Sequence, residues 1–174
     1  MAERYGIKRI SEILDRNIFV DANVLIYLNW AVAGNEQYEI DYSSVYLELM
    51  KQKNNLFVDF LVISEVVNRI LRIEHKKQQP NQEFKKFRDS EQGKTILSDI
   101  YSIIENRILD GVSIIGKSFS ENDIKSFLTV DSLDFIDKGI LNICRENNFV
   151  LLTNDKDYKN SDIDLLTCNK LILN

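Results

Sequence analysis

Short apolar runs alternate along the chain with longer segments in which apolar residues recur every three or four positions. The first strong run, residues 17–21 (NIFVD), is too short for a helix and has the β-branched and aromatic residues of a buried strand. The runs at 56–58 (LFV), 112–115 (VSII) and 149–152 (FVLL) have the same character, and residues 163–173 predict a last edge strand. This alternation predicts strands and helices in turn.

Helical spacing and capping residues predict where the helices begin. Ser43 and Ser44 are candidate N-caps for a helix over 45–53, and Asp59 is one for a helix over 60–74. Further helices are predicted over 23–31, 96–108, from 120 onward and over 133–147. Strands and helices of these lengths imply an α/β fold, a three-layer α/β/α sandwich whose mostly parallel, Rossmann-like central sheet is covered on both faces.

The chain is expected to form one domain. Its 174 residues correspond to roughly one domain of the usual size, and the single proline and six glycines leave no linker at which to divide it. One segment, about 74–93, is polar and rich in lysine. No apolar run approaches the roughly 18 residues of a membrane helix, and the N-terminal residues lack a signal-peptide pattern, so a cytoplasmic protein with no membrane segment is expected.

The composition limits which side chains could bind a metal or catalyse a reaction. With two cysteines, no CxxC spacing and one histidine, the chain cannot build a Cys/His zinc site, and a histidine-based triad would depend on His75, which lies in a charged run. The net charge of −5 argues against strong non-specific nucleic-acid binding, although a local basic patch is compatible with it. Any catalysis must therefore rest on carboxylates.

Several acidic residues are predicted to meet at one edge of the sheet. Asp21 and Asp155 follow two apolar strands, and the carboxyl ends of parallel strands lie at the same edge. Glu65 interrupts the apolar run LVISEVV, while Asp131, Asp134 and Asp137 stand three apart at the start of a helix. Two carboxylates at about 4 Å repel by about 4 kcal/mol at an effective dielectric of 20. Gathering them predicts a divalent cation, and all-oxygen ligands favour Mg²⁺ or Mn²⁺ and phosphoryl chemistry.

Three stretches in order resemble the PIN-domain nucleases, which include the VapC-like toxins: IFVDANVLIYL, DFLVISEVVNRIL and DKGILNICRENNFVLLTNDKDY. The resemblance spans nearly the whole chain. It implies that Asp21, Glu65, Asp137 and Asp155 are the catalytic residues and hold Mg²⁺ or Mn²⁺, since the family's helix aspartate stands sixteen positions before the threonine of its T-x-D turn, here Thr153. Asp134 and Asp157 compete for two of these roles.

The same resemblance implies a metal-dependent ribonuclease that hydrolyses RNA phosphodiester bonds, leaving a 5′-phosphate and a 3′-hydroxyl. Asn23 is expected to orient Asp21 or a water on the metal. If the chain is the toxin of a toxin-antitoxin pair, a cognate antitoxin protein is a partner. A homodimer through the early helices, with Leu28 and Trp30 in its interface, is compatible with the resemblance but is not required by any spacing.

Two sets of basic residues are candidates for binding the RNA. One is the cluster that includes Lys85 and Lys86, which alternates with Phe84 and Phe87 and resembles a surface for phosphates and unstacked bases. Nearby acidic residues dilute its charge, which favours a solvated helix face slightly. Arg69 and Arg72, on the helix that carries Glu65, are the alternative phosphate contacts.

Two other readings stay open. A haloacid-dehalogenase-like aspartyl phosphatase would use Asp21 as nucleophile, but it requires an aspartate where this chain has Asn23, and it gives Glu65 no role. A non-catalytic PIN-like module that binds RNA or protein is the second. A literal phosphate-loop pattern also occurs at 111–118, but its interior is itself the predicted strand and no helix follows it directly, which argues against nucleotide binding.

Overall fold

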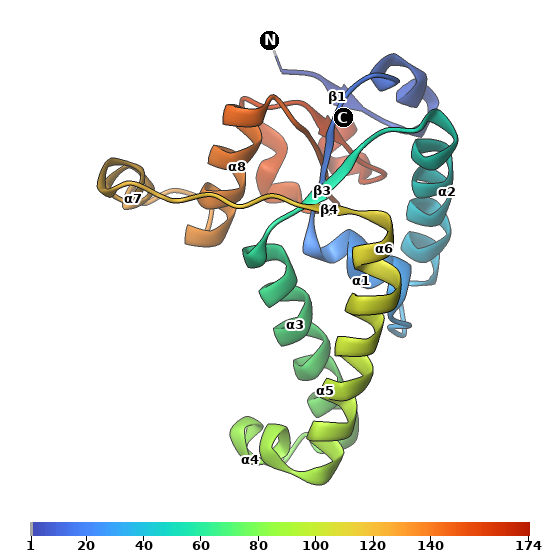
Figure 1. Ribbon diagram of the computed structural model, residues 1–174, viewed down its shortest axis with the longest axis vertical. Helices are drawn as coiled ribbons and strands as arrows, with labels where there is room; N and C mark the ends of the chain where they lie inside the picture. Colours follow the sequence, from blue (N-terminus) through green and yellow to red (C-terminus); the bar gives the residue numbers. More distant parts are fainter. Residues whose placement is uncertain (1) are drawn as a thin grey trace.

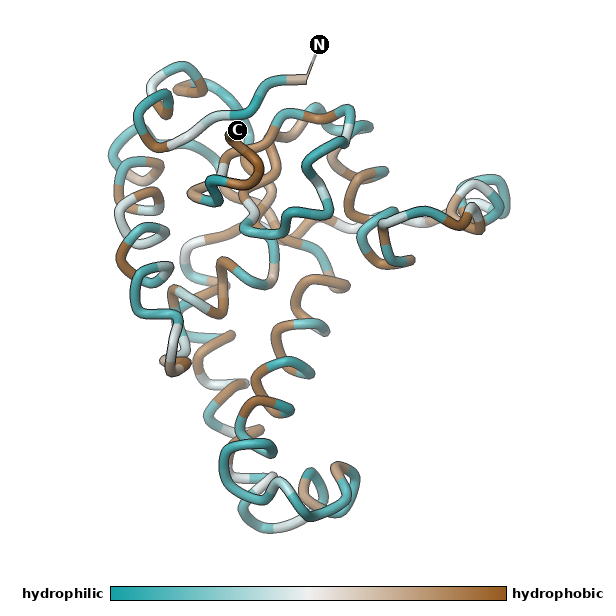
Figure 2. Tube along the Cα trace, turned by 180° about the vertical axis from the view of Figure 1, so that it is seen from behind, coloured by the Kyte–Doolittle hydropathy of each residue, from teal (hydrophilic) through white to brown (hydrophobic). Residues whose placement is uncertain are grey.

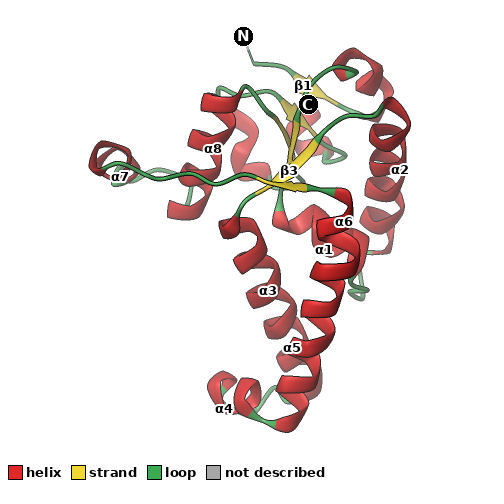
Figure 3. Ribbon diagram, in the orientation of Figure 1, coloured by secondary structure: helices red, strands yellow, loops and turns green. Residues whose placement is uncertain are grey.

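The fold is built on one parallel β-sheet. A computed structural model describes residues 2–174, and within them six strands pair side by side in the order β1-β6-β5-β2-β3-β4 (Figures 1 and 3). Every neighbouring pair is parallel. The strands are β1 (Arg4–Tyr5), β2 (Ile18–Val20), β3 (Leu56–Val58), β4 (Ser113–Ile114), β5 (Val150–Leu152) and β6 (Leu165–Leu166).

Helices cover both faces of this sheet. Successive side chains of a strand point to opposite faces, and all residues of β2 and β5 are buried, so neither face is open to solvent there. The longer helices are α1 (Ala22–Asn29), α2 (Glu36–Gln52), α3 (Phe60–Gln78), α5 (Glu91–Ile103) and α8 (Phe135–Asn147). Figure 2 shows the apolar residues gathered in the central strands and alternating with polar residues along the helices. The predicted three-layer α/β/α fold with a parallel sheet is confirmed.

Shorter helical segments join these elements. They are η1 (Ile7–Ile13), α4 (Phe84–Asp89), the π-helical η2 (Ile104–Ile108), α6 (Leu109–Gly111), α7 (Glu121–Phe127), η3 (Lys156–Asn160) and α9 (Lys170–Leu173). No helix of residues 2–174 combines the length and the apolar character needed to cross a membrane.

α3 and α5 pack against each other and project from the sheet as an arm, with α4 at its tip (Figure 1). The polar, lysine-rich segment predicted at 74–93 forms the end of α3, all of α4 and the start of α5. Phe87 of α4 is fully buried, and Gly93 lets α5 start close to α4, because a Cβ on Gly93 would lie only 2.1 Å from the carbonyl oxygen of Phe87. The arm is therefore a packed helical unit rather than a loose loop.

The helix starts predicted at Asp59 and Ser120 agree with the structure, whereas the helix predicted over 96–108 begins earlier, at Glu91, and the one predicted over 45–53 begins at Glu36. The Asp59 side chain accepts a hydrogen bond from the backbone N–H of Val62 at 2.9 Å, and Ser120 forms a capping box at the start of α7. The prediction that Ser43 and Ser44 cap a helix over 45–53 was wrong, because α2 begins at Glu36 and both serines lie inside it. Ser44 Oγ instead donates to the carbonyl of Ile40 in the preceding turn.

The sheet also differs from the prediction at one side. Residues 163–173 do supply a strand, β6, but it is internal, because β1 pairs with it and takes the edge position. β1 has only two residues, too few for a periodic pattern to reveal it. This pairing brings η1 and α9, from opposite ends of the described chain, to one end of the sheet.

Candidate carboxylate site

Asp21 is buried at the carboxyl end of β2, where it caps α1. Its Oδ1 accepts from the backbone N–H of Ala22 at 2.7 Å, while its Oδ2 accepts from Asn23 Nδ2 at 2.6 Å and from Thr153 Oγ1 at 2.5 Å. Burial raises the pKa of Asp21 to about 7, the hydrogen bond from Thr153 opposes that rise, and the charge of Glu65 adds to it. Asp21 is thus held rigidly in a setting that disfavours its ionised form.

Asp155 lies beside Asp21 because β5 is the parallel neighbour of β2. The register pairs Val20 with Leu152, so the residues that follow the two strands come together. Thr153 connects them: its hydroxyl donates to Asp21 and accepts the backbone N–H of Asp155 at 3.0 Å. Asp155 then caps η3, where its Oδ1 accepts the backbone N–H of Asp157 at 3.0 Å. The exposed Asp157 enters this arrangement through its main chain.

Asp137 belongs to a capping box at the start of α8. The Asp134 side chain accepts the backbone N–H of Asp137 at 2.8 Å, and Asp137 accepts the backbone N–H of Asp134 at 3.3 Å. The buried Tyr158 of η3 donates its hydroxyl to Asp137 Oδ1 at 2.6 Å. Burial raises the pKa of Asp137 to about 6, the Tyr158 hydrogen bond opposes this rise, and the charges of Asp134 and Asp155 add to it. Asp134, which competed with Asp137 for the role of metal ligand in the sequence analysis, is thus the N-cap of α8.

Glu65 faces the site from α3. Its side chain is 26% exposed, and its Oε1 accepts from Arg69 one turn later at 3.0 Å. A glutamate within an apolar run needs a charge partner, and Glu65 has one on its own helix. α3 packs against α1, the helix that Asp21 caps, and the charge of Glu65 contributes to the raised pKa of Asp21.

Four carboxylates thus come from four elements: Asp21 after β2, Glu65 on α3, Asp137 on α8 and Asp155 after β5. As placed in residues 2–174, no three His, Cys, Asp or Glu side chains converge closely enough to hold one ion. The donor set nevertheless fits a hard divalent cation, because all candidates are carboxylates and their mutual repulsion is part of what raises the pKa values of Asp21 and Asp137.

Asn154 is a hydrogen-bond hub that sequence reasoning missed. Its backbone N–H donates to Asn23 Oδ1 at 3.1 Å, and its Nδ2 donates to the Tyr27 hydroxyl at 3.1 Å. The buried Tyr42 hydroxyl lies 3.0 Å from Asn154 Oδ1, and Asn169 Nδ2 donates to the Asn154 carbonyl at 2.7 Å. The only sequence signal was its place between Thr153 and Asp155. Asn154 fixes the loop that carries Asp155.

A small pocket of about 240 Å³ opens next to these acids, and we call it the site pocket. Its lining includes Asn23, Asp155, Arg69 and Lys156, with Asn169 on its wall. Two cationic side chains therefore stand at the rim of the carboxylate cluster. Arg69 is one of the predicted phosphate contacts, and Lys156 was not predicted.

The remaining predicted substrate contacts lie on the arm. Arg72 stacks on the ring of Phe84 at 4.3 Å, and Lys86 lies 3.9 Å from Glu83. Lys85 is exposed on α4, which Figure 1 places at the tip, away from the sheet. Phe87 packs inside the arm, so its ring does not contribute to a base-binding surface, the alternative that the sequence favoured slightly less than a solvated helix face.

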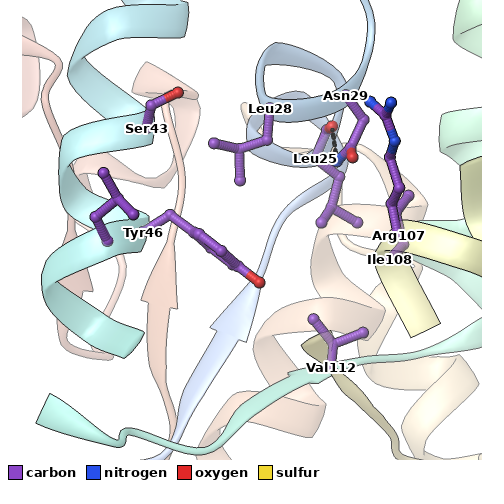
Figure 4. A pocket seen from close by; sticks show the side chains of 9 residues that line it. Leu25, Leu28, Asn29, Ser43, Tyr46, Arg107, Ile108 and Val112 are labelled. Carbon is purple, nitrogen blue, oxygen red and sulfur yellow. Dashed lines mark hydrogen bonds between the residues drawn. The ribbon is translucent and has the colours of Figure 1, made fainter. Parts of the chain in front are cut away.

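A separate cavity of about 350 Å³ lies between α1, α2 and η2, lined in part by Leu28, Tyr46 and Arg107 (Figure 4). None of the four acids lines it. Trp30, the other predicted interface residue, donates its indole N–H to the buried Glu74 at 3.0 Å, which ties α1 to the arm. A homodimer through this region stays a prediction.

The phosphate-loop pattern at 111–118 has none of the required structure. Gly111 ends α6, β4 occupies the interior of the pattern, and the next helix begins only at Glu121. Lys117 pairs with Glu146 at 2.5 Å rather than facing a helix N-terminus.

Comparison with known proteins gives the fold and then the family. A solved structure described as "Crystal structure of PAE2754 from Pyrobaculum aerophilum" superposes with a TM-score of 0.52 at 15% identity, covering 91% of this chain and 88% of that one, so the two share a fold. A family model of the PIN domain matches residues 18–163. The chain belongs to the PIN domain family, whose nucleases typically use divalent metal ions. None of the curated protein sequences compared with it matches significantly.

Proposed function

We propose that this protein is a Mg²⁺- or Mn²⁺-dependent endoribonuclease that hydrolyses RNA phosphodiester bonds at the carboxylate site. The observation that carries the proposal is one hydrogen-bonded web at the carboxyl edge of the sheet. Thr153 joins Asp21 to Asp155 through hydrogen bonds. Tyr158, from the segment that follows Asp155, donates its hydroxyl to Asp137 and so connects that aspartate to the same loop. Membership of the PIN family supports nuclease chemistry for such a web.

In this proposal Asp21, Glu65, Asp137 and Asp155 hold the cation. A bound Mg²⁺ or Mn²⁺ would supply Lewis-acid stabilisation of the phosphate and activate water for its hydrolysis. Asn23 and Thr153 fix the Asp21 carboxylate, and Asn154 fixes the loop of Asp155.

The cationic rim is suited to a phosphodiester. Arg69 and Lys156 line the site pocket together with Asp155, so a phosphate entering there would meet positive charge on one side and the acids on the other. Arg69 also neutralises Glu65 at 3.0 Å. This pairing keeps one carboxylate of the crowded site compensated in the metal-free protein.

The test is cleavage of a labelled single-stranded RNA with Mn²⁺ or Mg²⁺ and with EDTA. Asp137→Asn and Glu65→Gln should abolish cleavage, while Asp99→Asn, which changes an exposed acid on the arm, should cleave like the wild type. RNA bound but never cut would favour a non-catalytic module. Hydrolysis of a phosphate monoester that depends on Asp21, with RNA left intact, would favour the phosphatase.

A narrower form of the proposal is that the ribonuclease is the toxin of a toxin-antitoxin pair. A small DNA-binding protein encoded next to this chain, which forms a complex with it and stops cleavage, would support that form.

A further inference from the structure

A third cavity, of about 620 Å³, lies at the carboxyl ends of β1 and β6, and we call it the terminal cleft. Its walls come from η1, α2 and α9, and it is large enough for one or two nucleotides. Ile7 and Leu173, both partly exposed, give it an apolar surface. This cleft is separate from the four acids, none of which lines it.

The terminal cleft and the site pocket are neighbours across Asn169. Asn169 lines the site pocket, and its Nδ2 holds the carbonyl of Asn154 at 2.7 Å. The residues on either side of it in sequence, Cys168 and Lys170, line the terminal cleft. The two hollows therefore meet at the start of α9, on the same edge of the parallel sheet.

The cleft is positively charged, in a chain whose net charge is −5. Four cationic residues line it, Arg4, Lys8, Arg9 and Lys170, against a single acid, Asp41. Arg9 is engaged with Glu12 at 2.8 Å, and Arg4 donates to backbone carbonyls. Within the described residues, Lys8 and Lys170 are exposed and form no ion pair, so both ammonium groups are free for an anionic ligand.

The predicted basic cluster on the arm is less suited to that ligand. Lys86 and Arg88 have acidic neighbours at 3.9 and 2.7 Å, and the Phe87 ring that was to stack on bases is buried. The cations at the site pocket are Arg69, which pairs with Glu65, and Lys156, and the unpaired cations of the terminal cleft lie on the other side of Asn169.

We propose that single-stranded RNA held at the carboxylate site continues over Asn169 into the terminal cleft. Lys8 and Lys170 contact backbone phosphates there, as in sequence-tolerant single-strand binding, and Ile7 and Leu173 offer a base an apolar contact in place of aromatic stacking. The inference rests on the proposed ribonuclease function and adds the direction in which the substrate extends from the cut.

The experiment measures binding of a fluorescent single-stranded RNA of twelve nucleotides in EDTA over a range of salt concentrations. Each phosphate contact in single-stranded nucleic acid contributes about 0.7 to the slope of log affinity against log salt. The double variant Lys8→Ala/Lys170→Ala should therefore bind more weakly, with a slope smaller by about 1.4. Lys51→Ala/Lys125→Ala, which removes the same charge from α2 and α7, should keep the wild-type slope.

A length series sharpens the test. A dinucleotide confined to the carboxylate site should bind wild type and the Lys8/Lys170 variant equally, and the difference should appear only as the RNA lengthens. An unchanged slope for that variant, or a loss found instead in Lys85→Ala/Lys86→Ala, would overturn the proposed path. Both lysines of the cleft are exposed, and equal melting temperatures will verify that the variant is folded.

Failure of the path and failure of the ribonuclease are separable. If wild type cleaves RNA with Mn²⁺ while the Lys8/Lys170 variant binds and cleaves long RNA equally well, only the path is wrong. If wild type neither binds nor cleaves RNA, the ribonuclease proposal falls, and the inference about the terminal cleft falls with it.

Discussion

Replacing Asp21 by asparagine should stabilise the metal-free protein at alkaline pH. The pKa of Asp21 rises from its ordinary 3.8 to about 7 in the folded state, chiefly through burial. A raised carboxyl pKa means that the folded state prefers the protonated acid, so stability falls as the pH rises from about 4 to about 7. At 1.36 kcal/mol per pKa unit, the full loss is at most about 4 kcal/mol.

Asparagine keeps the shape of the side chain and removes that cost, but it weakens the hydrogen bonds from Ala22 and Thr153. Bonds to a charged group contribute about 1.5–3 kcal/mol, so we expect a net gain of about 2 kcal/mol at pH 8. For a chain of this size that corresponds to a melting temperature higher by about 4–8 °C. Near pH 4 the gain should vanish or reverse, because Asp21 is protonated in the fold.

Urea unfolding in EDTA at several pH values between 4 and 8 measures this difference. Asp99→Asn, an exposed acid on α5, is the matched control and should track wild type throughout. If Asp21→Asn is destabilised by the same amount at pH 8 as at pH 4, Asp21 is not a strained carboxylate. The electrostatic argument for a cation at the end of β2 would then be wrong.

Three further outcomes are expected. Mn²⁺ at 100 times its Kd should stabilise wild type by about 2.7 kcal/mol in thermal melts, and Glu65→Gln should lose that rise; an equal rise would remove Glu65 from the ion's ligands. Tyr158→Phe removes the hydroxyl that holds Asp137 and should weaken Mn²⁺ binding by about 10–100-fold in calorimetry, and unchanged affinity would leave Tyr158 with a packing role only. Phe87→Ala should cost about 3–5 kcal/mol in urea unfolding, and a cost below about 1 kcal/mol would contradict its burial.

The fold could be predicted largely because its inner strands are short apolar runs that end in turns or acids. β2, β3 and β5 were found in this way, and Asp59 marks the start of α3 through a local hydrogen bond. The acids at the ends of β2 and β5 follow from the same pattern, since parallel strands bring their carboxyl ends to one edge. Signals of this kind are local, so a single sequence reveals them.

The parts that could not be predicted depend on distant contacts. β1 is a strand only because β6 pairs with it, and the hydrogen bond from Tyr158 of η3 to Asp137 of α8 spans 21 positions. Serine is common at helix starts and is also tolerated inside a helix when it bonds to the preceding turn, which is why Ser44 was misread. The ion pair between Glu65 and Arg69, in contrast, could have been predicted from the sequence, because residues four apart lie on the same face of a helix.

The strand order also has a consequence for when the site forms as the chain is made. The central contact between Asp21 and Thr153 spans 132 positions, and Arg4 pairs with Leu165. Contacts so distant along the chain form late, because the loop between them must close first. When synthesis has reached only the end of the arm, the nascent chain contains Asp21 and Glu65. The Thr153 loop and α9 have not yet been synthesised. Both the carboxylate site and the terminal cleft thus form only with the last strands, so neither exists while most of the chain is still being synthesised.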